Sequence, residues 1–288
     1  MSSPLTERNA RRSGVRPVAS AAVGLFLLLT LTGCSEETVD SLKRLGLPQE
    51  TTDRAEYVRD LWVGSWIAAG IVGVFVWGLI VWAAVRYRRR SDDELPAQVR
   101  YNLPIEVLYT IAPIIVIAVL FFFTVETQNK ELETISDPDH TVRVVAQQWA
   151  WTFDYMKEPA IGGQSVYDTG TPAQPSELWL VEGQTVTFDL ISPDVIHSFW
   201  VPTFLMKLDV IPGKLNSFSV TPTRMGEFEG RCAELCGWQH SRMLFTLKVV
   251  DQAAFDAHLR DLQAAGQVGA PRGGEAADTI TGLEDNGQ

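Results

Sequence analysis

The stretch GRCAELCGWQHSRM, residues 230–243, gathers four side chains that could bind a metal ion. Cys232 and Cys236 are four positions apart, and His240 and Met243 follow within seven residues of Cys236. Thiolate and thioether ligands select copper, and imidazole also suits it. Outside the cell, two neighbouring cysteines more often form a disulfide. The histidine and the methionine beside the cysteines favour the metal site over the disulfide.

A copper site on this loop needs a second histidine from elsewhere in the chain. Among the four histidines, His197 ends an apolar strand in PDVIHSFWVP, 35 residues before Cys232, and is the natural candidate. His140 and His258 lie in polar segments, and we expect them to be ordinary, exposed surface residues. A β-sandwich that binds copper through His, Cys, His and a weak axial Met has the blue-copper arrangement. Relative to that arrangement, one cysteine is left over.

The extra cysteine predicts a site for two coppers. Two thiolates on a tight loop can each bridge two metals, so each copper then needs one histidine and one weak axial ligand. Met243 supplies one axial ligand, and the backbone carbonyl of Glu234 is well placed for the other. No open coordination position remains, which indicates electron transfer rather than substrate chemistry.

Two uncharged stretches precede the domain that must carry this site. Residues 61–85 would form a helix of about 37 Å, longer than the ~30 Å hydrocarbon core of a bilayer. Residues 107–125 form a second apolar span, which we expect Pro113 to kink. Five arginines lie between the spans, and the positive-inside rule places this loop in the cytoplasm. Everything after about residue 127 is therefore expected outside the cytoplasm.

The first 33 residues resemble a secretory signal, with four arginines before a short apolar core. This core ends in LTGC, which resembles the lipobox of bacterial lipoproteins and would make Cys34 the lipidated first residue of the mature chain. The alternative is an uncleaved membrane anchor with an idle cysteine. A secreted start agrees with the topology inferred from the arginine-rich loop.

The outer part of the chain is typical of β-structure. Short strands separated by Pro and Gly over roughly 120 residues predict a sandwich or barrel. Asp251 is the expected N-cap of one amphipathic helix, and the Gly-rich acidic tail is expected to be disordered. The predicted segments are a signal peptide 1–33, an outer segment 34–60, transmembrane helices 61–85 and 105–126 around a cytoplasmic loop 86–104, an outer domain 127–250, a helix 251–266 and a tail 267–288.

The acidic balance of the chain bears on its partners. The full sequence has 24 basic and 35 acidic residues. Removal of the signal would take away four arginines and one glutamate, leaving 20 basic and 34 acidic residues, a net charge of −14. Such acidity disfavours nucleic acid as a partner and suits a basic protein. Simple solubility explains the charge equally well.

The motifs HSFWVP, IPGKLN and GRCAELCGWQHSRM resemble the CuA domain of cytochrome c oxidase subunit II. The family architecture is a two-helix transmembrane hairpin followed by an all-β, cupredoxin-like domain, a Greek-key sandwich or barrel, outside the cytoplasm. The resemblance covers about residues 55–250. It implies that a dinuclear copper centre, CuA, is bound by His197, Cys232, the carbonyl of Glu234, Cys236, His240 and Met243.

The resemblance also implies roles for two glutamates. The side chain of Glu234 would bind a magnesium or manganese ion shared with oxidase subunit I. Glu106, at the start of the second span, would lie at the mouth of a proton channel in subunit I. The alternative for Glu106 is a charge at a membrane interface, which is common near helix ends.

The segment QQWAWTFDY resembles the aromatic segment of the family, in which the residue matching Trp149 receives electrons from the cytochrome. Trp149 shares a period of two with Trp151, Phe153 and Tyr155, so all four could instead form one core face of a strand. We expect electron entry at Trp149 and core packing for the other three.

As a member of that family the chain would take electrons from cytochrome c and pass them to haem in subunit I. There oxygen is reduced to water, coupled to proton translocation, in a bacterial cell membrane that also holds subunit III. The chain departs from familiar members in its lipobox, its extended tail and extra residues at about 157–176. That insertion could form a docking surface, so the donor is either a soluble cytochrome or, as we favour, one tethered in a supercomplex.

Three other classes of protein share part of this pattern. A quinol oxidase subunit has the same topology but lacks the copper ligands. Nitrous oxide reductase has a CuA domain but lacks the two spans and carries a second large domain. A copper chaperone or thiol oxidoreductase could use two cysteines but would not need both histidines and Met243. The complete ligand set argues against the first and the third class, and the two apolar spans argue against the second.

Overall fold

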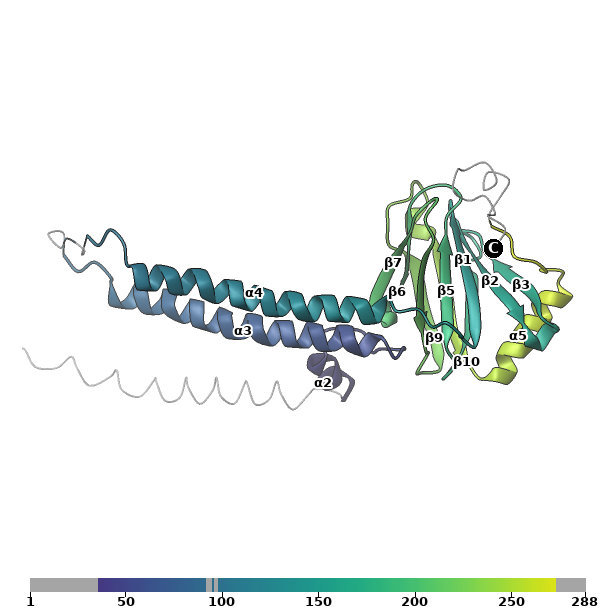
Figure 1. The fold of residues 1–288 in the computed structure, drawn as a ribbon, viewed down its shortest axis with the longest axis horizontal. Helices are drawn as coiled ribbons and strands as arrows, with labels where there is room; N and C mark the ends of the chain where they lie inside the picture. Colours follow the sequence, from purple (N-terminus) through teal and green to yellow (C-terminus); the bar gives the residue numbers. More distant parts are fainter. Residues whose placement is uncertain (1–35, 92–94, 96–97, 273–288) are drawn as a thin grey trace, which may run out of the picture. The chain divides into compact units, whose positions relative to one another are not determined.

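A computed structural model describes residues 36–91, 95 and 98–272 of the chain (Figure 1). The expected signal peptide, Cys34 and residues 273–288 lie outside the described residues. Residues up to Leu47 form a unit of their own, which contains helix α2 (Glu36–Lys43). All other described elements belong to the second unit, from Pro48 onward.

Two long apolar helices begin the second unit. Helix α3 (Ala55–Arg86) has 32 residues, and α4 (Leu103–Glu131) has 29. Both are long and apolar enough to cross a membrane by length and composition. Each helix extends several residues beyond its predicted apolar span, because backbone hydrogen bonding continues into the polar flanks. Their apolar side chains are largely exposed, as a surface meant for lipid or partner helices requires.

The rest of the unit is a β-sandwich, which confirms the predicted fold class (Figure 1). One sheet has the order β3-β2-β1-β5-β8, with strands β1 (His140–Gln147), β2 (Ala150–Glu158), β3 (Gln164–Thr169), β5 (Val186–Ile191) and β8 (Asn216–Val220). The other has the order β4-β10-β9-β6-β7, with strands β4 (Ser176–Val181), β6 (His197–Val201), β7 (Met206–Val210), β9 (Gly226–Cys232) and β10 (Leu244–Val250). Short 3-10 turns lie at η1 (Pro159–Ile161), η2 (Pro202–Phe204) and η3 (His240–Arg242).

The two sheets are tied together by crossing connections. Strands β1 and β5 pair in parallel, as do β4 and β10, and the other pairings are antiparallel. Strands β4 and β5 flank the turn Glu182–Gln184 but belong to opposite sheets. Consecutive strands that change sheet in this way enclose one core instead of forming a hairpin.

The core between the sheets is built from alternate residues of each strand, as the period of two dictates. Trp151, Phe153 and Tyr155 of β2 are fully buried, in agreement with the core role predicted for them. Phe199 and Phe245 from the other sheet stack at 5.2 Å between ring centroids. Such aromatic contacts provide a large buried apolar area around which the strand ends are held in place.

A terminal helix covers one side of the sandwich. Helix α5 (Gln252–Ala264) begins after Asp251, whose side chain accepts a hydrogen bond of 2.8 Å from the Ala254 amide. Buried residues recur along one face at helical spacing, and they are Phe255, Leu259 and Leu262. This face packs against the segment that includes η1, β3 and β4, which contains the predicted insertion.

Two predictions about this region differ from the structure. His140, expected to be exposed, is buried with its ring against Phe255 at 4.8 Å, because α5 covers it. His258 is half-buried and stacks on Trp179 at 4.4 Å. Gln267, predicted to begin a disordered tail, is held by a 3.1 Å hydrogen bond that its carbonyl accepts from the Tyr167 amide of β3.

Candidate metal centre

The predicted metal ligands converge at one end of the sandwich. Cys232 is the last residue of β9, and Met243 directly precedes β10. The antiparallel pairing of these strands continues into the loop, where the Cys232 amide donates a 3.0 Å hydrogen bond to the Met243 carbonyl. Cys236 and His240 lie on the loop between them, and His197 begins the neighbouring strand β6. Three strand ends therefore fix the positions of five side chains.

The sulfur atoms lie at the centre of this group. The Sγ atoms of Cys232 and Cys236 are 3.8 Å apart, well beyond the ~2.05 Å of a disulfide, and both cysteines are free. His197 Nδ1 lies 3.9 Å from Cys232 Sγ, and His240 Nδ1 lies 3.6 Å from Cys236 Sγ. Each cysteine thus has one imidazole nitrogen directed at it.

Two weaker donors complete the arrangement. Met243 Sδ is 3.8 Å from Cys236 Sγ, and the Glu234 carbonyl oxygen is 3.2 Å from Cys232 Sγ. The structure therefore brings together all six donors that the sequence predicts. His197, Cys232 and Cys236 alone already form a group whose ligand atoms lie within 4.8 Å of one another. Zinc sites use Cys, His and carboxylate ligands, whereas a thioether beside two thiolates and two imidazoles suits copper.

Burial protects this donor set from water. His197 is fully buried, and Cys232, Cys236 and Met243 are each exposed by no more than 5%. His240 is half-buried and is the ligand side chain with most access to the surface. When the charge on a bound metal changes, a ligand set excluded from solvent needs little reorganisation around it. A small reorganisation favours fast electron transfer.

Asp194 orients His197, a role that sequence reasoning missed. Its Oδ1 lies 2.9 Å from His197 Nε2, and its Oδ2 accepts a 2.6 Å hydrogen bond from the Gln148 amide. A proton on Nε2 that is donated to the carboxylate leaves the Nδ1 lone pair free for a metal. The only available signal in the sequence was an acidic residue three positions before the histidine.

Residues of the turn between β1 and β2 hold the cysteine loop from the other side. The Gln148 side chain donates a 2.7 Å hydrogen bond to the Cys236 carbonyl, and the Trp149 indole N–H donates one of 3.2 Å to the same oxygen. Trp151 donates to the Met243 carbonyl at 3.3 Å. Trp149 lies outside β2 and is half-buried, unlike the three aromatic residues that follow it in the strand.

The electrostatics of the site favour one thiolate. Burial raises the pKa of the Cys232 thiol, but the His197 ring and neighbouring backbone groups lower it more, to about 6. Burial and the adjacent Cys232 raise the pKa of Cys236 to about 12. Burial lowers the pKa of His197, but its hydrogen bond to Asp194 raises it above the ordinary value. A metal would draw the second thiol proton away, since thiolate is the ligand.

Glu234 and Glu106 lie in different surroundings. The Glu234 side chain is exposed while its carbonyl faces Cys232. Glu106 lies in the first turn of α4, where its carboxylate accepts a 2.9 Å hydrogen bond from the Asn102 amide. Glu106 therefore helps to cap the start of the helix, a local role that sequence reasoning did not assign.

Two apolar side chains of the cysteine loop face solvent. Leu235 is 79% exposed and Trp238 is 91% exposed, although they lie one residue before and two residues after buried Cys236. Large apolar side chains at the surface mark contact sites when they cluster. The surface of this loop thus presents two large apolar side chains next to the exposed Glu234.

Comparisons with known proteins give the family of the chain. Residues 140–250 match the family model "Cytochrome C oxidase subunit II, periplasmic domain". A probable cytochrome c oxidase subunit 2 of Streptomyces avermitilis is 45% identical, over 92% of this chain and 92% of that protein. The cytochrome c oxidase subunit 2 of Mycobacterium tuberculosis is 35% identical, over 86% of this chain and 82% of its own length.

Among solved structures, the periplasmic domain of subunit II of cytochrome oxidase from Bradyrhizobium japonicum is 26% identical, with a TM-score of 0.40. It covers 46% of this chain and 99% of that domain. The sequence relationships extend over the hairpin as well as the sandwich. On the strength of 45% identity along nearly the whole of both sequences, the chain belongs to the cytochrome c oxidase subunit 2 family.

Proposed function

We propose that the chain is the electron-input subunit of a haem–copper oxidase, and that its metal centre is the dinuclear copper site CuA. It accepts electrons from cytochrome c and passes them to haem in subunit I, where oxygen is reduced to water and protons are translocated. The observation that carries the copper assignment is the pair of unbonded cysteine sulfurs 3.8 Å apart, each with its own imidazole nitrogen.

Each residue has a distinct task in this proposal. Two bound coppers would supply one-electron redox chemistry. Cys232 and Cys236 would bridge the metals, and His197 and His240 would each complete one of them. Met243 and the Glu234 carbonyl would be the weak donors, which tune a site more than they hold it. Asp194 keeps the His197 ring in the tautomer that can bind.

Trp149 is proposed as the point of electron entry. Its indole N–H is hydrogen-bonded to the carbonyl of a ligand, Cys236, so a short bonded route leads from this half-buried ring to the site. The exposed Trp238 and Leu235 provide an apolar contact surface for the donor close to that route. The donor is proposed to be a cytochrome c, with the tethered form favoured, as argued from the insertion.

The remaining assignments follow from family membership. Glu234 is proposed to bind magnesium or manganese with subunit I, because its exposed side chain is free to face a partner. Glu106 is proposed at the mouth of a proton channel, alongside its capping role. Subunit III is a further proposed partner. The two apolar helices fit a membrane protein whose C-terminal domain is extracytoplasmic, and lipidation of Cys34 is proposed as an additional anchor in a bacterial cell membrane.

Metal analysis of the purified oxidase tests the copper assignment. We expect two coppers per copy of this chain beyond those of subunit I, a near-infrared absorption band from the mixed-valence pair, and unoxidised thiols at Cys232 and Cys236 by mass spectrometry. One copper per chain, or a stable disulfide in the active complex, would contradict the dinuclear site.

A further inference from the structure

A groove lies between α3 and α4, at the start of the first helix and the end of the second. It has a volume of about 500 Å³, within the range of small-molecule sites. Along α3 it reaches from Tyr57 to Ala68, a distance of about 16 Å at the rise of an α-helix. It therefore runs from the polar flank of the hairpin into the apolar span.

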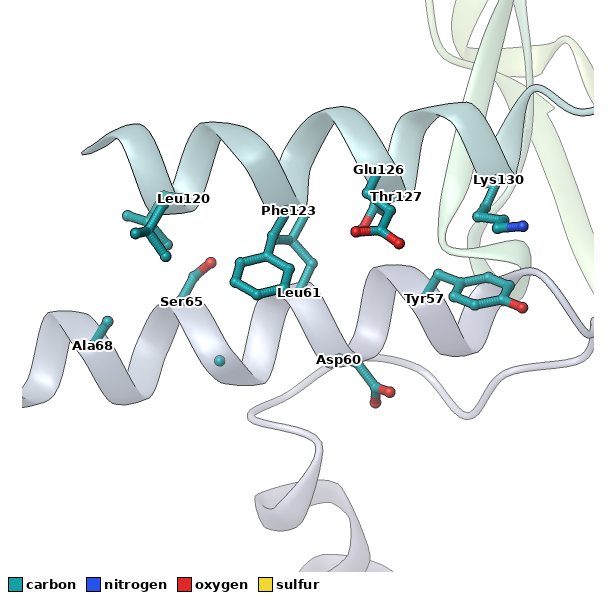
Figure 2. A pocket seen from close by; sticks show the side chains of 12 residues that line it. Tyr57, Asp60, Leu61, Ser65, Ala68, Leu120, Phe123, Glu126, Thr127 and Lys130 are labelled. Carbon is teal, nitrogen blue, oxygen red and sulfur yellow. The ribbon is translucent and has the colours of Figure 1, made fainter. Parts of the chain in front are cut away.

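The deep part of the groove is apolar. Figure 2 shows Leu120 and Phe123 extending from α4 towards α3, and Ser65 extending from α3 towards α4. The α3 wall is formed by small residues, Gly64, Ser65 and Ala68. Because these side chains do not fill the space opposite Leu120, a narrow apolar channel is left between the helices.

Three charged side chains lie at the outer rim of the groove, and one of them, Asp60 of α3, is paired with Arg59. Glu126 and Lys130 lie one turn apart on α4, and Figure 2 shows Glu126 and Thr127 directed towards α3. Within the part of the chain that the structure describes, no ion pair engages either charge. Tyr57 adds a hydroxyl at the same rim. The rim therefore offers an ammonium, a carboxylate and hydroxyl groups to one ligand.

We propose that this groove binds one phospholipid whose headgroup carries both a phosphate and a free ammonium, as in phosphatidylethanolamine. One acyl chain fills the apolar channel beside Leu120 and Phe123. The phosphate meets the Lys130 ammonium and the Thr127 hydroxyl, and the lipid ammonium meets the Glu126 carboxylate. Charge-assisted hydrogen bonds of this kind are the strong ones. An anionic lipid without an ammonium would leave Glu126 unpaired and facing a like charge.

A lipid fits the groove better than a helix of a neighbouring subunit does. A helix with its side chains is about 10–12 Å wide, and packed helix axes are only ~8–10 Å apart. A third helix would therefore lie across the mouth of the groove without filling the channel or satisfying the charges of Glu126 and Lys130. A single acyl chain is slender enough to enter it. The proposal does not depend on the metal centre.

Photolabelling of the assembled oxidase in nanodiscs tests this site. The probe is phosphatidylethanolamine with a photoreactive group on one acyl chain, compared with phosphatidylglycerol carrying the same chain. Peptide mass spectrometry should find labels on residues 61–68 and 119–123, several-fold more with phosphatidylethanolamine. Equal labelling by the two lipids would overturn the proposal, and this comparison needs no variant.

Three variants sharpen the test. Ala68→Phe fills the channel and should lower the labelling several-fold, whereas Ala69→Phe, at an exposed neighbouring position outside the groove, should not. Glu126→Gln combined with Lys130→Gln should remove the headgroup preference. Labelling that is unchanged in Ala68→Phe argues against the site. The isolated full chain should also be labelled in the same way as the oxidase. If labelling is seen in the isolated chain but disappears in the oxidase, a partner helix covers the groove and the proposal is wrong. Haem and copper content report correct assembly of each variant.

Discussion

Two aspartates of the β-sandwich, half-buried Asp194 and fully buried Asp154, differ in the partners that the fold gives to their charge. Asp194, beside His197, accepts hydrogen bonds from the Gln148 and Val195 amides and contacts the His197 ring. Burial raises its pKa, but these partners lower it below the ordinary value. Asp194 is therefore a fixed negative charge whose geometry is set by its neighbours.

Asp154, in the middle of β2, is fully buried on the strand face opposite the core residues Phe153 and Tyr155. Neither carboxylate oxygen has a hydrogen-bond partner among the described residues, and Arg143 approaches only to 4.0 Å. Burial raises the pKa of Asp154 to about 8, although Arg143 lowers it in part. The charge of Asp194 thus has several hydrogen-bond partners, whereas Asp154 has only the distant Arg143 among the described residues.

The largest effect is expected from Cys236→Ser. Serine cannot bridge two coppers, and Cys236 contacts Cys232, His240 and Met243 at once. We expect loss of the near-infrared band and of at least one copper per chain, measured on the purified oxidase. The fold should survive, because the loop is closed by main-chain bonds to Met243. Retention of both coppers and the band would show that the two sulfurs do not act as a bridge.

Asp194→Asn tests whether the contact between Asp194 and His197 contributes to copper binding. Loss of the carboxylate charge weakens control of the His197 tautomer, and changes of this kind typically cost 10–100-fold in metal affinity. Copper retention against a chelator series measures it. Asp189→Asn is the matched control, since Asp189 of β5 accepts a hydrogen bond from Ser217 of β8 and none of the described hydrogen bonds joins it to the metal-binding side chains. If both variants retain copper equally well, the Asp194 carboxylate is not needed to orient His197 for metal binding.

The sequence predicted which side chains converge far better than it predicted the residues that support them. Cys232, Cys236, His240 and Met243 lie in one loop, so spacing alone nearly specifies them, and His197 followed from the small number of histidines. Gln148 acts on Cys236 across 88 residues of sequence. No local pattern reveals such a bond, because it depends on how the β1–β2 turn meets the loop after β9.

The fold class could be predicted from the sequence as well as the converging side chains could. Uncharged helical spans and alternating strands carry their own signals, whereas burial of a single polar residue depends on distant cover. His140 shows the limit: its segment is polar, but α5, more than a hundred residues later, packs Phe255 onto its ring. Both long helices extend past the apolar runs that predict them, because backbone hydrogen bonds do not stop where the apolar run stops.

Trp149→Phe should produce a smaller, kinetic effect. The substitution removes the indole N–H bond to Cys236 but leaves an aromatic ring, and Gln148 still bonds the same carbonyl. We expect the rate at which cytochrome reduces the copper site to fall by about tenfold or less, because a hydrogen bond of this kind contributes ~1 kcal/mol. The copper spectrum should not change. Trp151→Phe is the comparison, because buried Trp151 belongs to the core. If Trp149→Phe lowers the melting temperature but leaves the rate of reduction by cytochrome normal, the role of Trp149 is structural.

Asp154→Asn should leave electron transfer untouched and change only the pH dependence of stability. A carboxyl whose folded pKa is raised above its unfolded value stabilises the fold fully only below the unfolded pKa, and this contribution is lost as pH rises towards the folded pKa. For Asp154 the loss runs from about pH 4 to about pH 8. Asparagine does not ionise, so its advantage over aspartate should grow across that range and level off above it, reaching on the order of a few kcal/mol. Hydrogen exchange of the β2 amides, corrected for intrinsic rates, reports local stability from pH 5 to 8.5. If the difference in local stability between variant and wild type stays constant with pH, Asp154 remains ionised in the folded protein, as Asp194 does. The two aspartates would then not differ in the way described above.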